Sequence, residues 1–149
     1  MQPPVLAIEV LPGNEDLGLP SYATQGAAGL DLKAALMEPL TLQPGQRNIV
    51  PTGLKMAIPS GFEGCVRPRS GLAMKQGLTL TNSPGTIDSD YRGEVKVLII
   101  NLGQEPVTLK RGDRVAQLLI APVVQAQVVK VERVEDTQRG VGGFGHTGR

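Results

Sequence analysis

The chain has 149 residues, of which 40% are hydrophobic and 19% are charged, with 15 basic side chains against 14 acidic ones. This length and composition indicate one globular domain and exclude a multidomain protein. The near balance of charge argues against nucleic acid as a partner, because binding to the phosphate backbone depends on clustered Lys and Arg side chains.

Runs of β-branched and aliphatic residues recur between Gly and Pro residues, of which the chain has 19 and 12. Short strands separated by turns in this way are typical of an all-β fold. Alternating side chains in residues 29–33 predict a strand with Leu30 and Leu32 facing the core. In chain order the expected strands are 5–10, 29–33, 46–50, 54–58, 62–66, 78–81, 95–101, 115–121 and 127–131.

Two of these strands are apolar almost throughout, at residues 95–100 and 118–120. Such strands are typically covered on both faces, here by a second sheet or by a neighbouring subunit. The one expected helix is 70–76, with Ser70 capping its first turn and Gly77 ending it.

The predicted domain occupies residues 1–138, and residues 139–149 form a Gly-rich arm that we expect to be mobile when nothing is bound. The single Cys65 and the single His146 exclude an internal disulfide and a structural zinc site, which needs four such ligands. No apolar run reaches the roughly 18 residues of a membrane span, and the first residues do not resemble a signal peptide. We therefore expect a cytoplasmic protein with no membrane partner.

Residues 67–73 combine Arg67, Arg69 and Ser70 at the expected start of the helix. Backbone N–H groups, a hydroxyl and guanidinium groups suit a phosphate, so the segment is a candidate anion site. The alternative is an ordinary surface helix with solvated arginines, and this segment alone does not decide between the two.

Residues 85–93 are predicted to form a β-hairpin loop that carries Asp88, Asp90 and Tyr91. Carboxylates at this spacing can activate a water molecule, and the aromatic ring can stack on a ligand. Asp-Ser-Asp is also common in simple turns, and that alternative stays open for the loop alone.

The arm nearly matches a phosphate-binding Gly-rich loop at residues 140–147, with His146 where that pattern requires Lys. A true Walker loop is therefore excluded. Gly-rich backbone can still wrap phosphates, and Phe144 can cover a flat group. The alternative is a disordered tail.

Taken in order, residues 28–31, 67–73, 85–93, 114–117 and 139–145 resemble the five motifs of the trimeric dUTPase family. The resemblance implies a jelly-roll-like β domain of the β-clip type that forms a homotrimer, with three active sites at subunit interfaces. It also implies hydrolysis of dUTP to dUMP and pyrophosphate by water attack on the α-phosphorus. Mg²⁺ would be held largely by the triphosphate. The reaction would keep uracil out of DNA and supply dUMP for dTTP synthesis.

By the same resemblance, Asp88 is the base that activates the water, and Tyr91 lies under the deoxyribose. Asn82 and the backbone from Thr86 to Lys96 would read the uracil. The residues expected to bind the nucleoside part are Asn82, Thr86, Ile87, Asp88, Tyr91 and Lys96.

The family motifs place the phosphate contacts on Arg69, Ser70, Gly71 and Gln117. Asp31 would act on Mg²⁺ only through water, or would support neighbouring arginines.

In the arm, Phe144 would stack on uracil, while Arg139, Gly145 and Thr147 would gather the γ-phosphate. Two other functions stay open: a dCTP deaminase-like enzyme, which needs a catalytic Glu beside the base, and a non-catalytic nucleotide-sensing trimer. The sequence of residues 85–93 favours the dUTPase.

Overall fold

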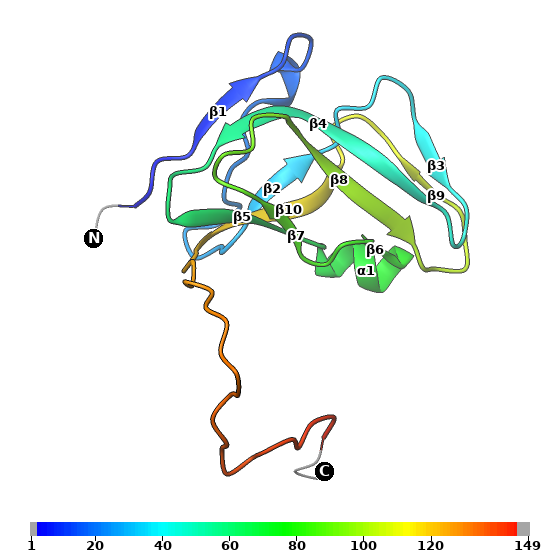
Figure 1. The fold of residues 1–149 in the computed structure, drawn as a ribbon. Coiled ribbons are helices and arrows are strands. Elements are labelled where there is room, and N and C mark those ends of the chain that lie inside the picture. The colour runs from blue at the N-terminus through cyan, green and yellow to red at the C-terminus, as the bar shows by residue number, and fades with distance from the viewer. Residues whose placement is uncertain (1–2, 146–149) are drawn as a thin grey trace.

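Two four-stranded antiparallel sheets make up most of the computed structural model, which describes residues 3–145 (Figure 1). The first sheet has the order β1 (Ala7–Val10), β4 (Arg47–Ala57), β8 (Glu94–Asn101) and β6 (Leu78–Leu80). The second has the order β2 (Leu30–Lys33), β10 (Arg114–Pro122), β5 (Phe62–Arg67) and β7 (Gly85–Ile87). A separate ribbon pairs β3 (Leu40–Leu42) with β9 (Val107–Leu109), and the helical elements are η1 (Glu15–Leu17) and α1 (Ser70–Gln76).

One hydrophobic core joins the two sheets, because side chains from both belong to a single buried cluster. On β8 the buried residues alternate, with Val95, Val97 and Ile99 pointing inward. On β2 the predicted alternation is found, with Leu30 and Leu32 buried. The prediction of an all-β, jelly-roll-like sandwich with one short helix is confirmed.

The strands expected at 46–50 and 54–58 are one continuous strand, β4. Sequence reasoning placed a break here because Pro51 and Gly53 interrupt the run. In the structure the pairing of β4 with β8 shifts register in this region, and the irregularity is held by hydrogen bonds. The hydroxyl of Thr52 donates to the carbonyl of Val95 at 2.6 Å, so the strand continues through a bulge.

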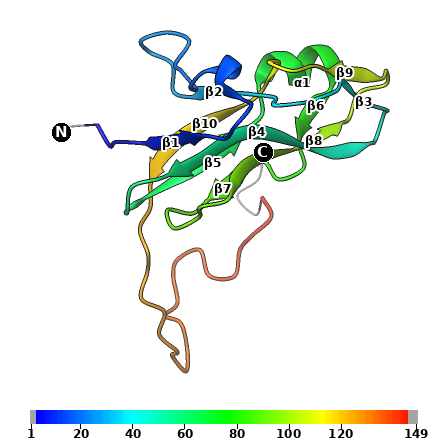
Figure 2. The same ribbon diagram turned by 90° about the horizontal axis from the view of Figure 1, so that it is seen from above.

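The strand predicted at 127–131 is absent, and this prediction was wrong. After β10 the chain leaves the sheets as an extended segment without regular structure, as both views show (Figures 1 and 2). Val128, Val129 and Val131 are exposed there. β-branched side chains favour a strand only where another strand offers backbone partners, and none does so for this segment within residues 3–145.

Helix α1 has the predicted bounds, but its first turn is not capped as predicted. Arg69 is the N-cap residue with extended backbone, and no side chain caps the first turn, so the capping role expected of Ser70 is wrong. Ser70 is instead the first helical residue. The predicted end is confirmed, because Gly77 has a φ of 68° and its N–H donates to the carbonyl of Ala73.

The loop after β7 is not a hairpin, in contrast to the prediction for residues 85–93. β7 pairs with β5 in the second sheet, whereas β8 pairs with β4 and β6 in the first. Residues 88–93 therefore cross from one sheet to the other. Turn residues between two apolar runs indicate a change of direction but do not show which strands pair.

A turn between β9 and β10 is tied to the first loop of the chain by Arg111. Its guanidinium donates to both oxygens of Asp16, at 2.6 and 3.0 Å, and to the carbonyl of Gly13. These hydrogen bonds hold the pKa of Asp16 below its ordinary value. The pair therefore stabilises the folded state above the carboxyl pKa of the unfolded chain, and this contribution is lost as the pH falls through the lower folded value.

Among residues 3–145 no helix has the length and apolar character needed to cross a membrane.

The end of β8 carries a fully buried polar side chain, Asn101. Its amide nitrogen donates to the carbonyls of Leu42 and Glu105, at 2.9 and 2.8 Å, and its oxygen accepts the N–H of Gly103 at 2.8 Å. The side chain thus joins β8 to β3 and to the loop before β9.

We expect Asn101→Ala to lower the free energy of unfolding by about 2 kcal/mol, because the carbonyl of Leu42 loses its partner inside the protein. Urea denaturation at fixed protein concentration measures this change. The control is Gln104→Ala at a neighbouring exposed position, which should stay within about 0.5 kcal/mol of the unaltered protein. Equal stabilities of the two variants would contradict the prediction.

Candidate active site

A hollow of about 240 Å³ opens between the end of β7 and the start of β8. All the residues expected to bind the nucleoside part contribute to its wall. They are Asn82, Thr86, Ile87, Asp88, Tyr91 and Lys96, and the remaining lining residues are Glu94, Val95 and Leu98. The crossing of the chain between sheets creates this hollow, because it places residues 82–88 opposite the beginning of β8.

The loop that carries Asp88 and Tyr91 is held by its own hydrogen bonds. The N–H of Tyr91 donates to the carbonyl of Asp88 at 3.1 Å. The guanidinium of Arg92 donates to the carbonyls of Ser89 and Tyr91, at 2.7 and 2.8 Å. Asp88 follows β7 directly and is exposed, so its carboxylate is free to meet a ligand or a water molecule.

A second cluster forms where β2, β10 and the start of α1 meet. The two carboxylate oxygens of Asp31 lie 3.1 Å from Nε of Arg69 and 3.1 Å from Nη1 of Arg114. Arg69 also donates to the backbone carbonyl of Arg114 at 3.2 Å. Asp31 is only 19% exposed, so it aligns two cations at the edge of the sheet.

Gln117 belongs to the same cluster. Its amide nitrogen donates to the carbonyl of Pro68 at 3.0 Å, just before the start of α1. A Cβ added to Gly29 would lie 2.7 Å from the Gln117 side-chain oxygen, so a glycine is needed there for this arrangement. Ser70 and Gly71, the other expected phosphate contacts, are exposed in the first turn of the helix.

Asp88 and the arginine cluster lie at different positions along β5. Ile87, which precedes Asp88, pairs with Gly64, whereas Gln117 pairs with Arg67. Three residues of strand separate these positions, about 10 Å. Within residues 3–145 no hydrogen bond or ion pair links Asp88 to the arginine cluster.

The arm lies apart from both clusters. The Nε of Arg139 donates to the carbonyl of Gly142 at 2.8 Å within the arm itself. Phe144 is fully exposed, and Gly145 is an exposed turn residue. The predicted contact Thr147 lies outside the described residues, as does His146.

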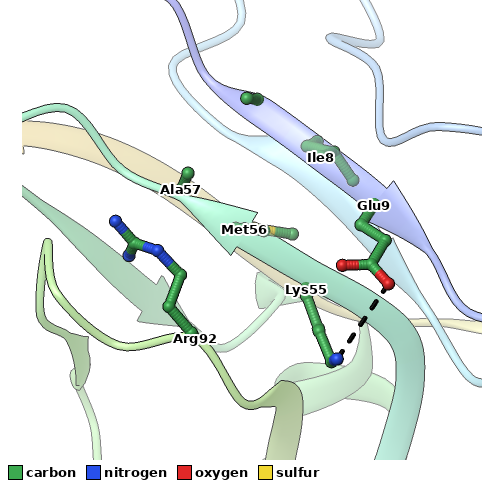
Figure 3. A pocket seen from close by; sticks show the side chains of 7 residues that line it. Ile8, Glu9, Lys55, Met56, Ala57 and Arg92 are labelled. Carbon is green, nitrogen blue, oxygen red and sulfur yellow. Dashed lines mark ion pairs between the residues drawn. The ribbon is translucent and has the colours of Figure 1, made fainter.

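Another hollow, of about 350 Å³, lies along β1 and β4 (Figure 3). Its charged side chains include Lys55 and Glu9, which pair at 4.0 Å, and Arg92, which comes from the loop after β7. Lys55 is paired with Glu9, Arg92 donates to carbonyls of its own loop, and the other lining residues are apolar, so this hollow offers little chemistry. The hollow at Asp88 is the stronger candidate.

Within residues 3–145, no three His, Cys, Asp or Glu side chains gather closely enough to hold a metal ion. The carboxylate of Asp31 is already paired with two guanidinium groups.

Comparison with known proteins identifies the family of the chain. The family model described as dUTPase matches residues 15–148. The chain belongs to the dUTPase family. A relative from Rhizobium leguminosarum bv. trifolii, named deoxyuridine 5'-triphosphate nucleotidohydrolase, is 59% identical over 97% of this chain and 94% of its own length. A relative of the same name from Anaeromyxobacter is 62% identical over 89% of each chain.

Solved structures of the family share the fold. The dUTPase of Staphylococcus bacteriophage 80alpha, solved with dUpNHpp, superposes with a TM-score of 0.87 at 25% identity. The alignment covers 97% of this chain and 99% of that one. The dUTPase of phage phi11 of S. aureus, described with a structural Mg(II) ion, has a TM-score of 0.77 at 24% identity over 87% of this chain and 97% of that one.

Sequence reasoning missed two side chains of these clusters. Arg114 stands in the fourth family motif, but its pairing with Asp31 depends on the contact between β2 and β10. Glu94 follows the third motif directly and lines the hollow at Asp88. Its charge beside a predicted ligand-binding loop was the available signal.

We expect a double-mutant cycle between Asp31→Ala and Arg69→Ala to give a coupling free energy of about 1 kcal/mol, because the pair is partly shielded from water. Urea denaturation of the four proteins measures it. A cycle between Asp31→Ala and Lys110→Ala is the control, since Lys110 has no contact with Asp31 in the structure. A coupling near zero for both pairs would show that the Asp31–Arg69 ion pair contributes nothing.

Proposed function

We propose that this chain hydrolyses dUTP to dUMP and pyrophosphate. The observation that carries the proposal is the hollow of about 240 Å³, which collects the nucleoside-binding residues and Asp88 on adjoining elements. Relatives more than half identical along nearly the whole chain bear the name deoxyuridine 5'-triphosphate nucleotidohydrolase. Prevention of uracil incorporation into DNA, and supply of dUMP for dTTP synthesis, follow from this reaction.

Asp88 is the proposed general base. Its exposed carboxylate accepts a proton from a water molecule, whose oxygen then forms a bond to the α-phosphorus of dUTP. The bond between the α-phosphorus and the oxygen that bridges to the β-phosphorus breaks, and pyrophosphate leaves with that electron pair. Mg²⁺ bound to the triphosphate supplies positive charge that offsets the charge of the phosphates.

The wall of the hollow supplies the proposed recognition of deoxyuridine. The Asn82 amide offers both a donor and an acceptor to the uracil edge, and the backbone of Thr86 and Ile87 adds main-chain groups. A slot lined closely by main chain excludes the thymine methyl group. Tyr91 fills the space that a ribose 2′-hydroxyl would need.

The arginine cluster is the proposed phosphate site. Arg69, Ser70, Gly71 and Gln117 bind the α- and β-phosphates. Asp31 holds Arg69 in place through the ion pair of 3.1 Å and contacts Mg²⁺ only through water. Mg²⁺ commonly takes its ligands from substrate phosphates and water, so this role needs no cluster of protein carboxylates.

A homotrimer with shared active sites is the proposed assembly. The separation of the two clusters along β5 supports it, because a site can combine Asp88 of one copy with the arginine cluster of a neighbouring copy. The outer face of the first sheet offers an apolar surface, where Ile49 is 54% exposed and Leu98 lies opposite it. Leu98 lines both a hollow on this face and the hollow at Asp88, so an interface here reaches the active site.

The arm of residues 139–149 is the proposed lid over the domain of residues 1–138. Phe144 is exposed with no partner nearby in the described chain, and a bound base would give its ring a flat surface to cover. Arg139, Gly145 and Thr147 would then reach the γ-phosphate. Closure of such a lid excludes bulk water from the reaction.

The experiment that tests this function incubates the protein with Mg²⁺ and, separately, with dUTP, dCTP, UTP and dTTP. Release of dUMP and pyrophosphate from dUTP alone is expected. Conversion of dCTP would favour the deaminase, and no turnover of any nucleotide would favour the nucleotide-sensing trimer. A cytoplasmic site of action stays a prediction from the sequence.

We expect Asp88→Asn to lower kcat about 10²–10⁴-fold while dUTP binding is retained, because the amide cannot accept the proton from water. Steady-state kinetics and equilibrium binding of a non-hydrolysable dUTP analogue measure the two effects. Asp90→Asn is the matched control, since Asp90 belongs to the same loop but does not line the hollow. Unchanged turnover in Asp88→Asn would remove it as the base.

We expect removal of residues 139–149 to abolish most hydrolysis while the trimer remains intact by sedimentation. Mixed trimers of this truncated chain and Asp88→Asn test whether sites are shared. If each site combines Asp88 and the arm from different copies, random mixing regenerates roughly a quarter of the sites. No recovered activity would place Asp88 and the arm in the same copy.

A further inference from the structure

The ring of Tyr91 depends on the residue two positions further along the chain. A Cβ added to Gly93 would lie 2.6 Å from Cζ of Tyr91 and even closer to its hydroxyl oxygen. Real side chains do not approach so closely, so the Tyr91 ring occupies its position only because residue 93 has no side chain. The backbone of Gly93 is not in the left-handed region, which means that alanine is permitted by the backbone itself.

The hydroxyl of Tyr91 is anchored beyond Gly93. It donates to the backbone carbonyl of Glu94 at 3.0 Å, which draws the ring across Gly93. Tyr91 is 46% exposed, so neighbouring side chains do not enclose it, and this hydrogen bond and the contact with Gly93 carry its placement.

Glu94 is itself fixed to the first sheet. One carboxylate oxygen accepts the N–H of Gly53, at the bulge of β4, at 2.9 Å. The other lies 3.7 Å from Nζ of Lys96. Tyr91, Glu94 and Lys96 all line the hollow at Asp88, so the anchor runs from a rigid strand to the wall of the candidate site.

We infer that Gly93 and Glu94 are positioning residues for Tyr91 and thereby set the selectivity for the deoxyribose over the ribose. This inference rests on the proposed function, in which the Tyr91 ring fills the space of a 2′-hydroxyl. Gly93 makes the position available to the ring, and Glu94 ties that position to β4. Neither residue touches the reacting phosphate.

The kinetic test compares kcat/KM for dUTP and UTP in Gly93→Ala. The added methyl group displaces the ring, so the dUTP-to-UTP ratio should fall at least about tenfold. Gly26→Ala is the matched control, because nothing lies within 4 Å of a Cβ at that exposed glycine, and it should keep the ratio. A ratio within about twofold of the unaltered protein, or an equal loss of both activities, would overturn the inference.

Glu94→Ala should lower the same ratio, because the N–H of Gly53 loses its acceptor and the anchor is released. Glu94→Gln keeps an oxygen acceptor and should restore the ratio. A merely structural role would affect both substrates equally in Glu94→Ala, and that result would also overturn the inference.

A second readout does not depend on turnover. The chain has two Tyr and no Trp, so Tyr91 is the only fluorescent side chain of this kind in a Tyr22→Phe background. In that background Gly93→Ala should increase quenching of Tyr91 fluorescence by acrylamide, and Gly26→Ala should not. Unchanged quenching would overturn the inference even if the protein proves inactive toward dUTP, whereas inactivity toward dUTP with increased quenching would overturn only the proposed function.

Discussion

The position of β5 between β10 and β7 sets the spacing between the two groups of candidate functional residues within one chain. Its hydrogen-bonded neighbours fix the register on both sides, with Gln117 opposite Arg67 and Ile87 opposite Gly64. The arginine cluster therefore lies at the Arg67 end of the strand, and Asp88 follows Ile87, which pairs nearer the other end. Rigid strands of this kind hold the two groups of residues at a constant separation, so neither cluster can move to the other without breaking the sheet.

Much of the fold could be predicted from the sequence, because local residue patterns indicate where many of its strands and its helix lie. The alternation around Leu30 and Leu32 gave the buried face of β2, and Gly77 gave the end of the helix. The failures arose where the outcome depended on distant partners. The valines of residues 127–131 have strand propensity, but no strand lies beside them in the described structure. The loop after β7 connects strands of two different sheets, and the local sequence does not show whether such strands pair with each other.

The candidate site was predictable to a similar degree. The motif residues at 82–96 do line one hollow, since they are close in sequence and lie on β7, on β8 and on the loops beside them. The family resemblance suggested that Asp31 supports neighbouring arginines, but it did not name Arg114, because that ion pair arises from the pairing of β2 with β10. The anchoring of Glu94 on Gly53 likewise depends on a bulge that the sequence suggested only as a break in a strand.

The distance along β5 has a consequence for the behaviour of the protein in dilute solution. In the trimer proposed above, a site assembled from several copies exists only while the copies are associated. For that trimer, specific activity would fall with dilution as the copies separate. The cell would then obtain activity that rises more steeply than the amount of protein.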